Sequence, residues 1–163
     1  MDFQKLFEMQ KALDRHIETK HQLLDENLFD RKVLALLVEL GELANETRCF
    51  KFWSVKPPSP HKVVLEEFVD GIHFILSLGI EFGFELEKME FPHSKTTTSL
   101  NEQFLRVYQL IVNFKQFRTY HHYQLMFRGY LELASLLGFT PAQIEQAYIE
   151  KNEVNYERQR QGY

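Results

Sequence analysis

Apolar residues recur every three or four positions along almost the whole chain, which is the period of an amphipathic α-helix. Runs that alternate apolar and polar residues between Asn-Gly or Asp-Gly turns are missing from the sequence. The pattern therefore predicts an all-α protein. Because the connections between the predicted helices are short, we expect about six helices in an antiparallel bundle.

Residues that start or stop helices divide this pattern. Ser99 and Thr140 each begin a capping box, and Gly138 ends the helix before the second one. Ser59-Pro60 predicts an N-cap followed by a proline at the first helical position. The predicted helices span about residues 2–21, 30–47, 59–80, 99 to beyond 114, 120–137 and 140–160. A polar loop is expected from Pro92 to Thr98.

Two helices carry informative patterns of apolar residues. The first has a core-facing stripe with the polar residue Gln10 in its middle, and a buried amide requires a hydrogen-bonding partner. That partner is more often another buried polar group than a ligand. The second helix, from about Asp30 to Thr47, is apolar on most sides, so we expect it at the centre of the bundle.

Composition narrows the class of protein. A chain of 163 residues with 44% hydrophobic residues suits one domain spanning residues 1–163. A net charge of -4 gives no general reason to bind nucleic acid or an anionic membrane. A single cysteine, Cys49, fits a reducing compartment, and the sequence has neither a leader pattern nor an apolar run that would span a bilayer. We therefore expect a soluble, cytoplasmic protein.

Four carboxylates interrupt the apolar pattern in two matched pairs, Glu39 with Glu42 and Glu67 with Asp70. Residues three apart lie on one face of a helix, so two facing helices would aim four carboxylates at a common point. Oxygen ligands of this kind favour magnesium or manganese over zinc. The alternative is that the pairs mark the solvated edges of two amphipathic helices.

Two other segments carry candidate binding residues. Lys151, Asn155 and Arg158 are spaced at i, i+4 and i+7 on the last helix, which places two cations and an amide on one face for phosphate binding. A solvated terminal helix would show the same cations. Trp53, the only tryptophan, lies between the two acidic helices, where it would stack on a base or plug the end of the bundle. His73 follows Asp70 by three residues and is expected to be a bundle residue rather than a ligand.

Three stretches resemble the dimeric dUTPases, a family of the MazG-like all-α nucleotide pyrophosphohydrolases. They run from Leu40 to Ser54, from Leu65 to Phe74 and from Lys151 to Tyr163. The Glu-x-x-Glu and Glu-x-x-Asp pairs alone are typical of the whole superfamily. The tryptophan between them and the terminal Lys-Asn-x-x-Asn-x-x-Arg-Gln run are similar to the dUTPase branch.

The resemblance implies magnesium-dependent hydrolysis of dUTP to dUMP and pyrophosphate, with water attacking the α-phosphorus. It implies that Glu39, Glu42, Glu67 and Asp70 hold the metal. It also implies that a carboxylate beside the metal deprotonates the water, for which we favour Glu42, with Glu39 as the alternative. The family's dimer implies a homodimer in which the second chain completes each site.

For substrate binding, the resemblance implies that Gln10 lies near the base and that Trp53 packs on uracil. It assigns Lys151, Asn155 and Arg158 to the phosphates and sugar, and it extends less closely to Asn152 and Tyr163. Asp14 occupies a position where some members of the family carry asparagine.

Two alternatives to dUTP hydrolysis remain at this stage. A related pyrophosphohydrolase would act on dCTP or on several nucleoside triphosphates, because the groups that recognise uracil depend on geometry that the sequence does not contain. A non-catalytic helical interaction module would carry the acidic pairs as ordinary surface charge. The second alternative predicts no magnesium-dependent release of pyrophosphate.

Overall fold

The structure is a computed structural model that describes residues 1–88 and 97–163, and within these residues it is helical with no strand. The prediction of an all-α protein is confirmed. The elements are α1 (Phe3–Lys20), α2 (Phe29–Thr47), α3 (His61–Glu81), the 3-10 helix η1 (Phe84–Leu86), α4 (Leu100–Phe117), α5 (Tyr120–Leu137) and α6 (Pro141–Arg160). Of the loop expected from Pro92 to Thr98, all but the last two residues lie outside the described residues. None of these helices is long and apolar enough to cross a membrane.

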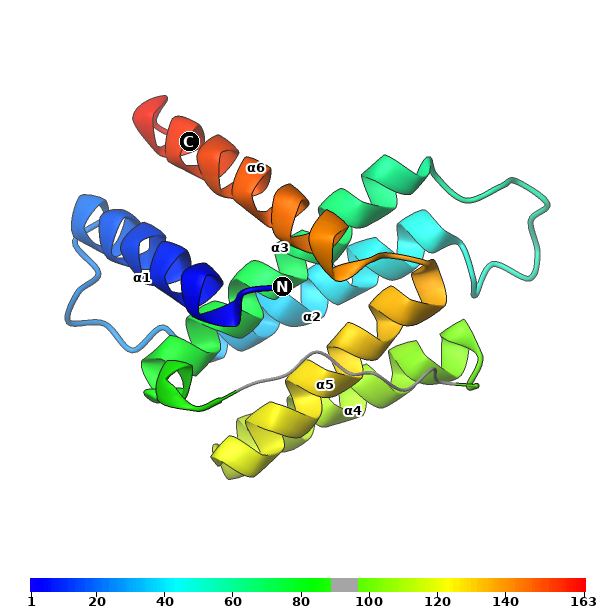
Figure 1. Ribbon diagram of the computed structural model, residues 1–163, viewed down its shortest axis with the longest axis horizontal. Coiled ribbons are helices and arrows are strands. Elements are labelled where there is room, and N and C mark those ends of the chain that lie inside the picture. The colour runs from blue at the N-terminus through cyan, green and yellow to red at the C-terminus, as the bar shows by residue number, and fades with distance from the viewer. Residues whose placement is uncertain (89–96) are drawn as a thin grey trace.

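The centre of the bundle is α3. Helix α2 lies along it, α1 and α6 pack on it and on each other, and the pair formed by α4 and α5 covers the remaining side (Figure 1). The expectation that the second helix takes the central place is wrong. Leu34 and Val38 of α2 are 62% and 50% exposed, because α2 packs mainly against α3 and α4 and no described residue covers its outer face.

The helix starts follow the predicted caps at two places and differ at a third. Ser99 and Thr140 both form complete capping boxes, which confirms those predictions. At the third place, Pro60 is the N-cap of α3 rather than its first helical residue. Ser59 makes no cap because its hydroxyl donates instead to Glu46 at the end of α2. That bond ties together the two helices that carry the acidic pairs.

Close contacts between α3 and α5 depend on glycine. The hydroxyl of Tyr130 donates to the backbone oxygen of Phe68 over 2.8 Å, and a Cβ atom on Gly71 would lie only 2.0 Å from that hydroxyl. The arrangement recurs two turns later, where Tyr123 lies against Gly79. These tyrosines fix how α5 lies on the central helix.

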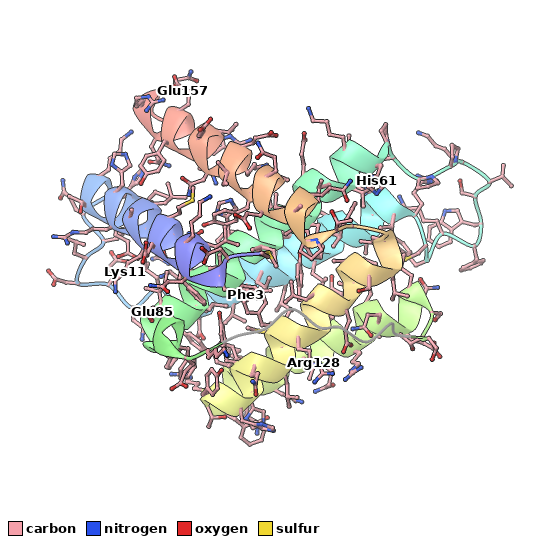
Figure 2. The ribbon with its side chains drawn as sticks, in the orientation of Figure 1. Phe3, Lys11, His61, Glu85, Arg128 and Glu157 are labelled. Atoms are coloured by element: carbon pink, nitrogen blue, oxygen red, sulfur yellow. The ribbon has the colours of Figure 1, made fainter. Side chains whose placement is uncertain are left out.

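Ion pairs join the ends of the helices around α1. Lys11 of α1 lies beside Glu85 of η1, with 3.1 Å between ammonium and carboxylate (Figure 2). Lys32 of α2 is 3.3 Å from both Glu18 and Glu81, and it therefore connects α1, α2 and α3. These contacts hold the first helix over one end of α3, where it forms a wall of the candidate site.

Candidate active site

Three of the four predicted carboxylates meet where α2 faces α3. Glu39, Glu67 and Asp70 each offer one oxygen, and the three oxygens lie within 4.8 Å of one another. Residues 67 and 70 share a face of α3 because they are three positions apart, and α2 brings Glu39 opposite that face. All three side chains are half-buried.

Glu42 lies one helical turn beyond Glu39 and outside this group of three oxygens. Its side chain is exposed, but its charge still acts on Glu39, Glu67 and Asp70. The neighbouring acidic residues are engaged elsewhere. Glu46 accepts from Ser59, and the carboxylate of Glu66 lies 3.9 Å from the ammonium of Lys62.

Burial and mutual repulsion make the acidic group costly to ionise. Loss of hydration, followed by repulsion from Asp70, Glu42 and Glu67, raises the pKa of Glu39 to about 7. Burial likewise raises the pKa values of Glu67 and Asp70 above their ordinary range. A cation placed among these oxygens would relieve both effects.

Lys151 of α6 already supplies one positive charge. Its ammonium donates to Asp70 over 2.6 Å, and both side chains are 17% exposed. This ion pair opposes the rise in the pKa of Asp70. Lys151 of α6 therefore lies at the acidic group itself.

A cavity of about 350 Å³ opens beside the acidic group, between α1, α2, α3 and α6. One wall contains Glu39 and Asp70, and another contains Asn155 and Arg158 of the last helix. Apolar side chains line much of the remaining surface. The other polar residues that line it include Gln10, Asp14 and Glu18 of α1, Lys32 of α2, and His73 and Ser77 of α3. The cavity is large enough for a small planar ring and its polar substituents.

Gln10 has the buried polar partners that the sequence pattern required. Its Oε1 accepts from Tyr148 over 2.8 Å and from Nδ1 of His73 over 2.7 Å. Its Nε2 donates to Oδ1 of Asp14 over 2.7 Å. The rings of His73 and Tyr148 stack with their centroids 4.2 Å apart. Gln10 therefore links residues of α1, α3 and α6 at the inner end of the cavity.

The basic face of α6 points toward the same cavity. Arg158 and Asn155 line it, and the guanidinium of Arg158 lies over the ring of Tyr163 at 5.1 Å. Asn152 is buried, and its Nδ2 has no hydrogen-bonding partner. The structure thus brings the cations of the last helix together with the acidic group.

The structure does not bring Trp53 to this cavity. Trp53 lies in the connection between α2 and α3, which projects from the end of the molecule opposite the turn between α1 and α2 (Figure 1). Its side chain is 64% exposed and makes edge contacts with Phe50 and Phe52, at centroid distances of 6.0 and 5.0 Å. Leu28 and Lys32, at the other end of α2, line the cavity instead.

Sequence reasoning assigned no role in the site to His73, Lys32 or Ser77. All three line the cavity. The position of His73, three residues after Asp70 on the same face of α3, was a usable signal for the histidine. Nothing in the sequence pairs Lys32 or Ser77 with Gln10.

Taken together, the donor set suits a hard divalent cation. The three grouped ligands are all carboxylates, and no histidine or cysteine of the described residues joins their group. Cationic side chains beside such a group are suited to phosphates, and the adjoining cavity is suited to a planar base. The arrangement matches what hydrolysis of a nucleotide requires.

Comparison with known proteins agrees with this chemistry. Residues 2–163 match the family model described as dUTPase. No curated protein matches the chain. The family match favours an enzyme over a helical interaction module. The chain therefore belongs to the dUTPase family, whose members hydrolyse dUTP.

Proposed function

We propose that the protein hydrolyses dUTP to dUMP and pyrophosphate in a magnesium-dependent reaction, in which water attacks the α-phosphorus. The observation that carries the proposal is the group of oxygens from Glu39, Glu67 and Asp70, within 4.8 Å of one another at the mouth of a cavity. We assign these three residues, with Glu42 beside them, as the residues that hold the metal. When bound, magnesium supplies positive charge that offsets charge developing on the phosphates and lowers the pKa of the attacking water.

Glu42 is assigned as the general base, with Glu39 as the alternative. Support for this division comes from Glu39 belonging to the group of three oxygens while Glu42 remains outside it and exposed. A carboxylate with an oxygen that is not bound to the metal can orient a water and accept its proton. The alternative role for Glu39 draws support from its place within the group of three oxygens, beside the position at which a metal would hold the water.

The phosphates are assigned to the cationic face of α6. Arg158 can bind phosphate oxygens through its planar guanidinium, and Lys151 acts as a point charge after leaving Asp70. Asn155 lies between them on the helix and can donate to phosphate or sugar. The base then enters the cavity between α1 and α3, near Gln10.

We assign Trp53 to the substrate that is bound by the second chain of a dimer, rather than to the substrate in its own chain. Its exposed ring lies outside the cavity in which we place the base. The family relation gives the aromatic residue a stacking role, and a loop of the partner can bring it there. Trp53→Ala is then expected to weaken nucleotide binding.

A homodimer is proposed on the basis of an apolar face that none of the described residues covers. Leu34 and Val38 lie on the outer side of α2, and Leu105 and Val112 share a stripe of α4 with Tyr108. The hydroxyl of Tyr108 donates to the backbone of α2 over 3.3 Å, so the two stripes lie next to each other. Adjacent exposed apolar stripes are typical of an interface between protein chains.

A cytoplasmic location is proposed because the fold needs no disulfide. Cys49 is unpaired and partly buried in the connection after α2. The fold therefore has no intramolecular disulfide that a reducing compartment would break.

The test is a panel of nucleotides with and without divalent metal. The wild-type protein should release pyrophosphate from dUTP with magnesium, more efficiently than from dCTP, dTTP or dATP, and chelation should abolish the reaction. Glu42→Gln should lower kcat by at least about a hundredfold while leaving the thermal midpoint unchanged. Glu66→Gln, which alters a surface carboxylate paired with Lys62, is the control and should keep wild-type turnover. Higher efficiency on another nucleotide, or full activity of Glu42→Gln, would contradict the corresponding assignment.

A further inference from the structure

The connection between α2 and α3 exposes large apolar side chains. Phe52, Trp53 and Val55 are all exposed, and the rings of Phe52 and Trp53 meet at right angles. Apolar side chains that gather in water on a short segment are typical of a surface that contacts another molecule. A segment without regular secondary structure serves this purpose best when its backbone is already held in one conformation, because ordering it on binding costs free energy.

Both ends of this connection are fixed to the last turn of α2. At its end, the backbone nitrogen of Ser59 donates to the backbone oxygen of Glu46 over 3.0 Å, and the Ser59 hydroxyl donates to the carboxylate of the same residue. Near its start, the ammonium of Lys51 donates to Oδ1 of Asn45 over 2.5 Å. The chain therefore leaves α2 and returns to it, so that residues 48–58 form a loop whose ends meet.

Arg48 reaches across this loop. Its backbone is left-handed, with φ 57°, at the point where α2 ends. Its Nε donates to the backbone oxygen of Lys56 over 3.0 Å, and its Nη2 donates to the hydroxyl of Ser54 over 2.7 Å. Ser54 directly follows Trp53 in the chain, and Lys56 directly follows Val55. One guanidinium thus holds the two residues that come after exposed apolar side chains.

Ser54 joins the guanidinium to the rest of the loop. Its hydroxyl also accepts from the backbone nitrogen of Lys56 over 3.3 Å, and its own backbone nitrogen donates to the backbone oxygen of Lys51 over 3.1 Å. Arg48 and Ser54 are half-buried, whereas Trp53 is exposed. Within residues 1–88 and 97–163, no carboxylate forms an ion pair with Arg48, so the guanidinium serves the loop alone.

We propose that Arg48 is a positioning residue, whose guanidinium holds the loop so that Trp53 is ordered before it meets the nucleotide bound by the second chain. The inference rests on the proposed function, which gives Trp53 that contact. Without the guanidinium, Ser54 and the backbone of Lys56 lose their common partner, and the loop gains conformations. Binding must then order the loop, so the nucleotide is held less tightly although no group that touches it has changed.

The fluorescence of Trp53 tests the hold directly, because Trp53 is the only tryptophan in the chain. In Arg48→Met, the fast component of its time-resolved anisotropy should grow about twofold, since loop motion occurs on the nanosecond scale that this signal reports. Arg48→Lys keeps the charge but lacks the planar fork, so its anisotropy should be intermediate. Arg31→Met is the matched control and should keep the wild-type anisotropy, because Arg31 is an exposed residue of the same helix that pairs with Glu26. Wild-type anisotropy in Arg48→Met would overturn the inference.

Steady-state kinetics test whether the hold serves the substrate. Arg48→Met should raise KM for dUTP about tenfold, which corresponds to ordering one side chain on binding, and should keep kcat within about twofold of the wild type. In a Trp53→Ala background the same substitution should have no further effect on KM, because no ring is left to position. An equal rise in both backgrounds, or an unchanged KM in Arg48→Met, would also overturn the inference. The proposed function fails by a different result, which is a wild-type protein that releases no pyrophosphate from dUTP with magnesium.

Discussion

Glu39 shows most clearly how the acidic group stores unfavourable free energy. Its pKa is about 7 in the folded chain and near 4.5 when unfolded, so between these values the folded state binds more protons. Stability therefore decreases as pH rises through this range, and the full penalty is present above pH 7. A metal or a neutral substitution removes the penalty.

Glu39→Gln should therefore stabilise the metal-free protein at pH 8. The side chain is half exposed, so solvent screening reduces the gain to about 1 kcal/mol, or roughly 2–4 °C in thermal midpoint. The midpoint is measured by thermal unfolding with chelator present, and the gain should shrink at pH 5. A midpoint lower than that of the wild type at pH 8 would show that Glu39 stabilises the fold.

The same residue makes metal binding depend on pH. A proton on Glu39 competes with the metal, so affinity should rise as pH increases from 6 toward 8 and then level off. Below pH 7 the change approaches about tenfold per pH unit if one proton is displaced. Calorimetric titration with Mn²⁺, in two buffers of different ionisation enthalpy, measures both the affinity and the proton release. Affinity that is constant from pH 6 to pH 8 would contradict the shift.

At the scale of the elements, the central helix is held by tyrosines over glycines. Gly71→Ala would put a Cβ atom 2.0 Å from the hydroxyl of Tyr130, which must then move and lose its bond to Phe68. We expect a loss of about 1–3 kcal/mol in the free energy of unfolding, measured in urea. Gly41→Ala is the control, since its Cβ would lie 3.1 Å from the end of Tyr108 at a half-buried site. An equal loss in both variants would indicate a general effect of the substitution.

The sequence predicted where the helices lie along the chain better than it predicted which helices pack against one another. Capping residues such as Ser99 and Thr140 act within one helical turn, so they can be recognised locally. The start of α3 was misjudged because Ser59 bonds to Glu46 on another helix, and no local pattern reveals that bond. The same reason explains why an apolar composition did not tell which helix is central.

The candidate site shows the same contrast between local patterns and contacts across the chain. Spacing along each helix identified two pairs, Glu39 with Glu42 and Glu67 with Asp70, and predicted that they face a common point. The buried contacts of Gln10 with His73 arise from residues 63 positions apart. Only the structure could show that both ends of the Gln10 amide are engaged.

For the whole molecule, the apolar stripes of α2 and α4 predict its assembly. Light scattering with size exclusion should give the mass of two chains. Leu34→Glu combined with Val38→Glu should shift the protein to one chain, because burying two carboxylates in an apolar interface is costly. Leu24→Glu changes a residue that is 60% exposed in another region and should leave the mass unchanged. A wild-type protein with the mass of one chain would refute the dimer.

If the acidic group binds a divalent metal as proposed, the ion pair between Lys151 and Asp70 makes loading of the site an exchange of cations. One ammonium leaves as one divalent ion enters, so the local charge rises by one unit rather than two. The binding free energy measured for a metal is then the difference between the free energy of binding the metal and that of holding the Lys151 ammonium. Lys151→Met should bind Mn²⁺ more tightly and pyrophosphate more weakly than the wild type in calorimetric titrations, whereas a loss of affinity for both would disprove the exchange. An enzyme built in this way would keep Asp70 paired until the metal arrives, and would then release a positive charge for the phosphates.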